Sequence, residues 1–122
     1  MIHEPKIADA IAITAREFRL SPAALTGERG HADISFARHV AMYLARSTVP
    51  RASFERIGRA LGNRDHSTIL FGVRKIAAMV AADPLIAAAT DRLAAEIHAR
   101  AAARIPPDLA AWNGLGGTLR AV

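Results

Sequence analysis

The chain has 122 residues, the length of one compact domain with a short tail, which excludes a multidomain nucleotide-driven machine. Apolar residues make up 52% of the sequence, but only 5% of it is aromatic and 28 positions are alanine. We therefore expect helices packed closely on helices and exclude a large β-sandwich. The net charge is +5 and 14 of the 16 cationic residues are arginine, which favours a polyanionic partner.

Several classes of site are excluded by the composition. Without cysteine the chain can form no disulfide, no thiolate zinc site and no cysteine nucleophile. The five histidines show neither i,i+4 pairing nor carboxylates at metal-ligand spacing, so no metal site is expected. No apolar run approaches the roughly 18 residues that cross a bilayer, and the N-terminus is not typical of a signal peptide. We therefore expect a soluble cytoplasmic protein with no membrane partner.

The first half of the chain predicts two long helices and a short one between them. Apolar residues recur every three or four positions over about 6–19 and again over about 34–48, which indicates two amphipathic helices. Ser21 is an N-cap followed by proline, and it predicts a short helical turn at 23–25. Residues 28–35 are expected to form a loop.

Residues 53–82 have the outline of a helix-turn-helix. Ser53 is a good N-cap for a helix of about ten residues, which Gly62 closes. Asp65 can cap a second helix, with an apolar face formed by Ile69, Val73, Ile76, Ala77 and Val80. The opposite face of that helix carries Ser67, Thr68, Phe71, Arg74 and Lys75. Two helices joined by a short glycine-containing turn are typical of this motif.

A last helix and a tail follow. Asp83 and Pro84 repeat the pattern of cap and proline, and apolar residues then run at helical spacing as far as residue 105. Two roles stay open for this alanine-rich helix: it covers the core of its own domain, or it forms a homodimer. Trp112 is the one residue of the tail expected to pack. The predicted domains are a helix-turn-helix domain at 1–82, an additional helix at 83–106 and an irregular tail at 107–122.

The excess positive charge lies in one segment. Residues 1–37 and 76–122 are close to neutral, whereas residues 38–75 hold eight cations and two anions, a net charge of +6. A solvated helix face usually intersperses both signs as i,i+4 pairs, and this segment does not. The distribution favours a binding face.

Within this segment three stretches form a specific pattern. They read RHVAMYLAR at 38–46, SFERIG at 53–58 and GNRDHSTIL at 62–70, and VRKI follows at 73–76. Together they closely resemble the C-terminal DNA-binding domain of the bacterial chromosomal replication initiator DnaA, over roughly residues 5–80. The resemblance implies an all-α, multi-helix helix-turn-helix fold of the Trp-repressor-like kind, and double-stranded DNA as the partner.

The same resemblance implies two sets of DNA contacts. The recognition helix would begin at Asp65, and its base readers in the major groove of the DnaA box would be Arg64, Asp65, His66 and Ser67. Phosphates would be held by Arg38, Arg46, Thr68, Arg74 and Lys75. The chemistry agrees, because arginine can donate twice to guanine, and aspartate can accept from the amine of cytosine.

Two departures from the family pattern bear on specificity. In the family, a basic loop before the long helix enters the minor groove, but here residues 27–33 read GERGHAD. Only Arg29 is available there for the minor groove, and Glu28 and Asp33 oppose the approach of phosphate. Ser67 replaces the commoner threonine and so lacks the methyl group that can pack on a thymine methyl, and we expect a relaxed preference at that base.

The expected function is that of a DNA reader without an enzymatic activity. Initiators of this family carry an upstream ATPase domain, but this chain has no Gly-x-x-x-x-Gly-Lys-Ser/Thr motif. We expect a free-standing, nucleoid-associated regulator of replication initiation or transcription that binds no nucleotide and no cofactor. Consecutive helical residues project about 100° apart, so Asp65, His66 and Ser67 do not converge as a catalytic triad. The alternative is an adaptor that binds a protein partner through its C-terminal helix.

Overall fold

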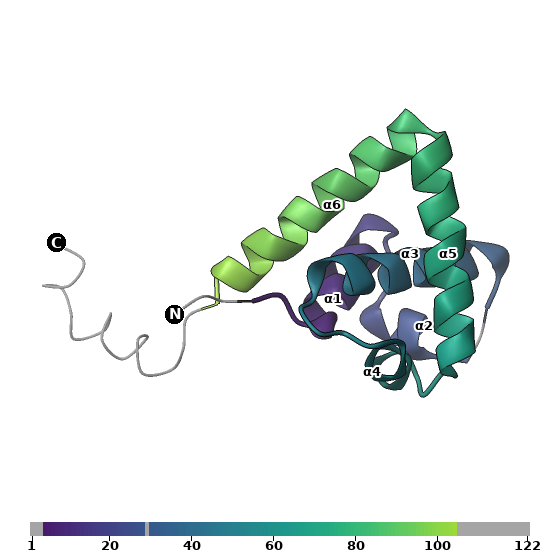
Figure 1. Cartoon of the computed structure of the whole chain (residues 1–122). Helices are drawn as coiled ribbons and strands as arrows, with labels where there is room; N and C mark the ends of the chain where they lie inside the picture. The colour runs from purple at the N-terminus through teal and green to yellow at the C-terminus, as the bar shows by residue number, and fades with distance from the viewer. Residues whose placement is uncertain (1–3, 29, 105–122) are drawn as a thin grey trace, which may run out of the picture.

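The computed structural model describes residues 4–28 and 30–104, and within these ranges the chain forms six helices and no strand (Figure 1). The predicted all-α fold class is therefore confirmed. The helices are α1 (Ile7–Glu17), α2 (Pro22–Thr26), α3 (Ala32–Thr48), α4 (Phe54–Ala60), α5 (His66–Ala82) and α6 (Pro84–Ala102).

Helix α3 lies at the centre of the fold and packs against each of the other five described helices. Its buried residues Ala37, Ala41 and Ala45 lie about one turn apart, and their small side chains let the neighbouring helices approach closely. The core is continuous from α1 to α6. Its fully buried side chains include Leu25, Leu44, Ile57, Ile69, Ile76 and Ile97.

The predicted caps begin the helices. The Ser21 hydroxyl accepts a hydrogen bond from the Ala24 amide, and the Ser53 hydroxyl accepts one from the Arg56 amide at 3.1 Å. Asp65 caps α5 in the same way. Each cap satisfies a backbone N–H that has no partner inside its helix, so these positions fix where the helices start.

The start of α3 differs from the prediction. The helix predicted from about residue 34 begins at Ala32, two residues inside the predicted loop, and the Ser35 amide donates to the His31 carbonyl at 2.9 Å. Asp33 lies in the first turn of α3, where its negative charge interacts favourably with the positive end of the helix dipole. The connection between α2 and α3 is therefore shorter than the sequence suggested.

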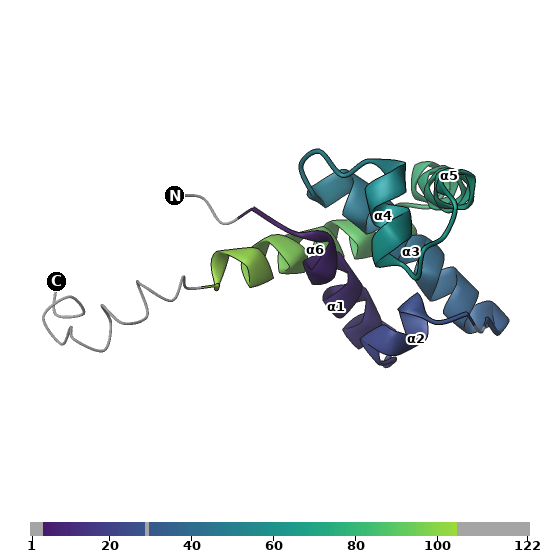
Figure 2. The same cartoon turned by 90° about the horizontal axis from the view of Figure 1, so that it is seen from below.

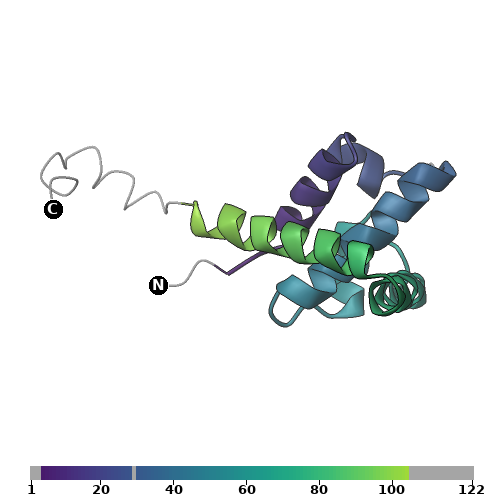
Figure 3. The ribbon, with the colours of Figure 1, turned by 90° about the horizontal axis from the view of Figure 1, so that it is seen from above.

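Helices α5 and α6 meet at a sharp bend and diverge from it (Figure 1). Asp83 ends α5, and its carboxylate accepts from the Leu85 amide at 2.9 Å to cap α6. Figure 2 views α5 nearly end-on with α4 beside it. Figure 3 shows α6 passing over α1 and α3.

Helix α6 covers the core of its own domain. Leu93 and Ile97 are buried in the same cluster as the core residues of α1 to α5, so residues 83–102 are packed into one unit with the helices before them. Self-association through α6 stays a prediction. The predicted tail at 107–122, with Trp112, lies outside the described residues. In the part of the chain that the structure describes, no helix is long and apolar enough to span a membrane.

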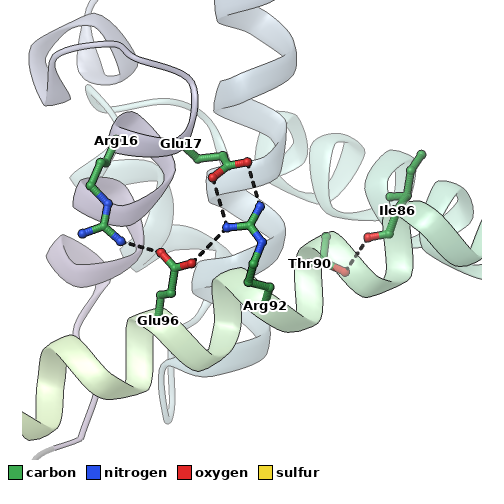
Figure 4. A network of polar contacts seen from close by, with 6 residues as sticks. All are labelled: Arg16, Glu17, Ile86, Thr90, Arg92 and Glu96. Atoms are coloured by element: carbon green, nitrogen blue, oxygen red, sulfur yellow. Dashed lines mark hydrogen bonds and ion pairs between the residues drawn. The ribbon is translucent and has the colours of Figure 1, made fainter.

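Two groups of ion pairs hold α6 against α1. In the first, Arg92 bridges Glu17 and Glu96, and Glu96 also pairs with Arg16 (Figure 4). These side chains are partly exposed to solvent, so we assign their ion pairs little net stability. The second group is built around the buried carboxylate of Asp9.

Candidate nucleic-acid interface

The turn between α4 and α5 is held by close backbone contacts. The Arg64 amide donates to the Gly58 carbonyl at 2.8 Å, and a Cβ atom at Gly58 would clash with the Arg64 carbonyl oxygen. Gly62 and Asn63 have φ angles of 77° and 60°, in the left-handed region that glycine and asparagine adopt most readily. These contacts fix α5 against α4 as the second helix of a helix-turn-helix.

Helix α5 has one buried face and one exposed face. Ile69, Gly72 and Ile76 are buried. The opposite side, here called the outer face of α5, consists of the exposed residues His66, Ser67, Thr68, Phe71, Arg74 and Lys75. No acidic residue occurs between positions 66 and 82. Beyond the cap Asp65, whose carboxylate lies beside Ser67, this face presents two hydroxyls and two cations, which are suited to a phosphate-bearing polymer.

Three of the four predicted base readers lie together at the N-terminus of α5. Asp65, His66 and Ser67 are all exposed, and the Asp65 carboxylate accepts from the Ser67 amide at 3.0 Å and from the Ser67 hydroxyl. These two hydrogen bonds lower the pKa of Asp65 below its usual value, which favours its anionic form. The Ser67 hydroxyl donates to Asp65, so its oxygen remains as an acceptor for an incoming group.

Arg64, the fourth predicted base reader, is not brought together with the other three. Its guanidinium is partly buried and donates to the carbonyl oxygens of Leu61 and Gly27, both at 2.6 Å. Arg64 thereby ties the turn of the helix-turn-helix to the residue that follows α2. No local pattern in the sequence indicates this contact, because 37 positions separate Arg64 from Gly27.

The predicted phosphate ligands lie in three different places. Thr68, Arg74 and Lys75 are exposed on the outer face of α5. Arg46 is exposed elsewhere, where it donates to the Ala52 carbonyl at 2.7 Å and its guanidinium carbon lies 4.6 Å from the centre of the Phe54 ring. Arg38, in contrast, is buried.

The structure does not place Arg38 where it could hold a phosphate. This residue is only 5% exposed, and its guanidinium donates to the carbonyls of Leu25, Ala24 and Gly27 at 2.8, 3.0 and 3.2 Å. Burial, followed by the charge of Arg64, lowers the pKa of Arg38. A buried arginine needs such partners, and these carbonyls, rather than a phosphate, are the partners that the structure gives Arg38. Arg29, predicted for the minor groove, lies outside the described residues.

His39, to which the sequence pattern assigns no role, lies behind the outer face of α5. Its ring meets the Phe71 ring edge-on at 5.7 Å, and its buried Nδ1 has no hydrogen-bond partner among the described residues. Burial, and then the charges of Lys75 and Arg38, lowers the pKa of His39, so the ring is neutral at pH 7. The periodicity of α3 could not reveal this contact, because Phe71 belongs to another helix. Across residues 4–28 and 30–104, no group of three His, Asp or Glu side chains could hold a metal ion.

Comparison with known proteins gives the family of this chain. The family model described as the bacterial DnaA protein helix-turn-helix matches residues 7–76, which is more than half of the chain. The chain belongs to this DnaA helix-turn-helix family. The match runs from the first residue of α1 into α5 and includes the entire outer face of that helix.

Individual DnaA proteins show the same likeness. The chromosomal replication initiator protein DnaA of Rhodopseudomonas palustris strain HaA2 is 39% identical over 93 residues, covering 76% of this chain and 20% of that protein. The DnaA protein of Nitrobacter hamburgensis is 44% identical over 78 residues, covering 64% of this chain and 16% of that protein. The chain thus spans a fifth or less of the length of these DnaA relatives.

Proposed function

We propose that this chain binds double-stranded DNA with a preference for DnaA-box-like sequences, with α5 lying in the major groove. The observation that carries the proposal is the outer face of α5, which exposes the His-Ser-Thr part of the family element beside two cations, with no acidic residue from position 66 to position 82. A recognition helix reads base edges mainly through residues near its N-terminus. The proposal assigns no nucleotide to this chain, whose sequence lacks a phosphate-binding loop motif.

The proposed contacts divide between bases and phosphates. Asp65 would accept from the exocyclic amine of a cytosine, and His66 and Ser67 would contact the neighbouring base edges. Thr68, Arg74 and Lys75 would bind phosphates, which sets the register and the affinity but not the sequence. Arg38 and Arg64 are left out of this set, because both donate to carbonyls of the fold.

The biological role that fits this binding is control of replication initiation or of transcription at such sites. Because it would bind chromosomal DNA, we place the protein on the nucleoid. A protein that occupies a DnaA box competes for it with any other reader of that box, so its effect would depend on its concentration and on its preference for the site.

Fluorescence anisotropy tests the proposal directly. The chain is titrated against a DnaA-box duplex and a scrambled duplex of equal length, at two salt concentrations. We expect at least a tenfold preference for the box, about 1.4 kcal/mol, and an affinity that falls steeply as salt is added. Equal binding to both duplexes would contradict the sequence preference. Weak, salt-independent binding would favour the adaptor that uses its C-terminal helix.

A matched pair of arginine variants tests the placement of the DNA. Arg74→Ala removes a cation from the outer face of α5, whereas Arg19→Ala removes an exposed cation after α1. If Arg74 binds a phosphate, its loss should reduce the slope of log affinity against log salt by about one and weaken box and scrambled DNA alike. Arg19→Ala should leave the slope unchanged, and equal effects of the two variants would refute the assignment.

A further inference from the structure

Phe71 is a large apolar side chain left open to solvent in the middle of the outer face of α5. It is 61% exposed, and among the described residues only Leu85, at 80%, is another large apolar side chain of this kind. An exposed apolar side chain that lies within a binding surface calls for an explanation more than one scattered elsewhere on the protein.

Residues of α3 pack against α5 on the inner side of Phe71. Gly72 is buried against α3, and a Cβ atom there would clash with the Met42 sulfur and press on the His39 ring. Helix α5 therefore packs closely on α3 at the position next to Phe71. On its inner side the Phe71 ring meets the His39 ring edge-on, at an interplanar angle of 74°. This support holds the ring in place and leaves its other side free.

The surroundings of Phe71 are those of a DNA contact. Ser67 lies one turn before it, and Arg74 and Lys75 lie three and four residues after it, so all four share one side of α5. A protein partner would need a wider apolar patch, but here a single ring is flanked by a hydroxyl and two cations. On the major-groove edges of the bases, the apolar group is the 5-methyl group of thymine, which phenylalanine can contact.

We propose that Phe71 reads a thymine methyl group in the major groove and so specifies thymine at one position of the site. The inference rests on the proposed function, because it needs α5 in the groove. Phe71 lies about 5–6 Å from Ser67 along α5, and therefore reaches a base near the one that Ser67 contacts. Ser67 itself has no methyl group to offer, so Phe71 supplies the apolar contact on this face.

Replacement of thymine by deoxyuridine tests the proposal, because it removes the methyl group and leaves the base pair intact. Each thymine of the DnaA-box duplex is replaced in turn, and affinities are measured for the unaltered chain, for Phe71→Ala and for Leu85→Ala. We expect one thymine at which deoxyuridine weakens the unaltered chain about fourfold, the factor for burying one methyl group. Phe71→Ala should lose this discrimination at that position, whereas Leu85→Ala should keep it.

The outcomes separate the inference from the function beneath it. A box-specific chain that tolerates deoxyuridine at every position would overturn the role of Phe71 and leave the proposed function standing. The role of Phe71 would also be overturned if Phe71→Ala kept the discrimination between thymine and deoxyuridine, even if it weakened binding to both duplexes. Failure of the folded, unaltered chain to bind any duplex at low salt would overturn both. Circular dichroism of each variant verifies that the fold is retained.

Discussion

Three arginines of the basic segment have three different environments, although the sequence presents them alike. Arg38 is buried among carbonyls, Arg64 is partly buried and ties two elements together, and Arg74 is exposed on α5. The guanidinium group has five donors in a planar fork, so it can satisfy backbone carbonyls as well as phosphates. Its surroundings, rather than its charge, decide which of these partners it takes.

At the scale of single residues, Gly58 is a position of the helix-turn-helix that has no room for a side chain. Because a Cβ atom there would clash with the Arg64 backbone, Gly58→Ala must displace the turn before α5. We expect a loss of about 2–4 kcal/mol in the free energy of unfolding, measured by urea denaturation. Gly27→Ala is the control, because Gly27 has an extended backbone and only a tight contact with a carbonyl. Equal losses in both variants would contradict this account.

At the scale of elements, hydrogen bonds to carbonyls near the C-terminus of α2 join this helix to α3 and to the helix-turn-helix. Arg38 donates to Ala24, Leu25 and Gly27, and Arg64 donates to Gly27 as well. The C-terminal end of a helix carries partial negative charge and unpaired carbonyls, so two cations are favourable there. The contacts fix the start of α5 relative to the segment that leads into α3.

Substitution of Arg64 tests this connection. Arg64→Ala leaves the Leu61 carbonyl without its charged donor and the Gly27 carbonyl with Arg38 alone, and we expect the free energy of unfolding to fall by about 1–3 kcal/mol. Arg59→Ala, which removes an exposed arginine from α4, should change it by less than about 0.5 kcal/mol. If the two variants were equally stable, Arg64 would not act as a structural tie, and its role as a base reader would regain support.

The packing of α6 gives a second prediction at this scale. Ile97 is fully buried in the common core, whereas Leu85 at the start of the same helix is 80% exposed. Ile97→Ala should cost about 2–5 kcal/mol of unfolding free energy, because it leaves a cavity in the core. Leu85→Ala should cost almost nothing. Thermal unfolding followed by circular dichroism distinguishes the two, and a negligible effect of Ile97→Ala would mean that α6 is an appendage.

At the scale of the whole molecule, one buried carboxylate joins the two ends of the described chain. The Asp9 side chain of α1 is 3% exposed and pairs with Arg100 at 3.1 Å and with Arg104 at 2.6 Å. Its carboxylate also accepts from the Lys6 amide at 2.8 Å. Burial raises the pKa of Asp9, but the hydrogen bonds and charge of Arg104, together with Lys6 and Arg100, outweigh it, and the pKa is lowered overall.

Because the pKa of Asp9 is lowered in the folded chain, the free energy of unfolding depends on pH. The stabilisation by Asp9 is present above the pKa of aspartate in the unfolded chain, about 3.9, and is lost as the pH falls through the lower folded pKa. We expect Asp9→Asn to reduce the free energy of unfolding by about 1–3 kcal/mol at pH 7, because it removes the charge from a buried pair with two partly exposed partners. The difference from the unaltered chain should narrow below about pH 4.

Urea denaturation at a series of pH values measures this effect. Asp91→Asn is the matched control, because Asp91 is exposed on α6 and should contribute little at any pH. A constant difference between Asp9→Asn and the unaltered chain from pH 7 to acid would show that the carboxylate charge does not hold α1 to α6.

The sequence by itself determined the helices, their caps and the family of this chain. Ser53, Asp65 and Asp83 could be identified as caps because capping depends on residues within one turn, and the apolar spacing predicted the helices to within a few residues. The exposed element at the start of α5 was predictable for the same reason. Only the tertiary structure decided which arginines donate to carbonyls of the fold. It also showed that the His39 ring packs against Phe71 and that α6 shares the core. These facts depend on contacts between residues far apart in the chain, which no local pattern encodes.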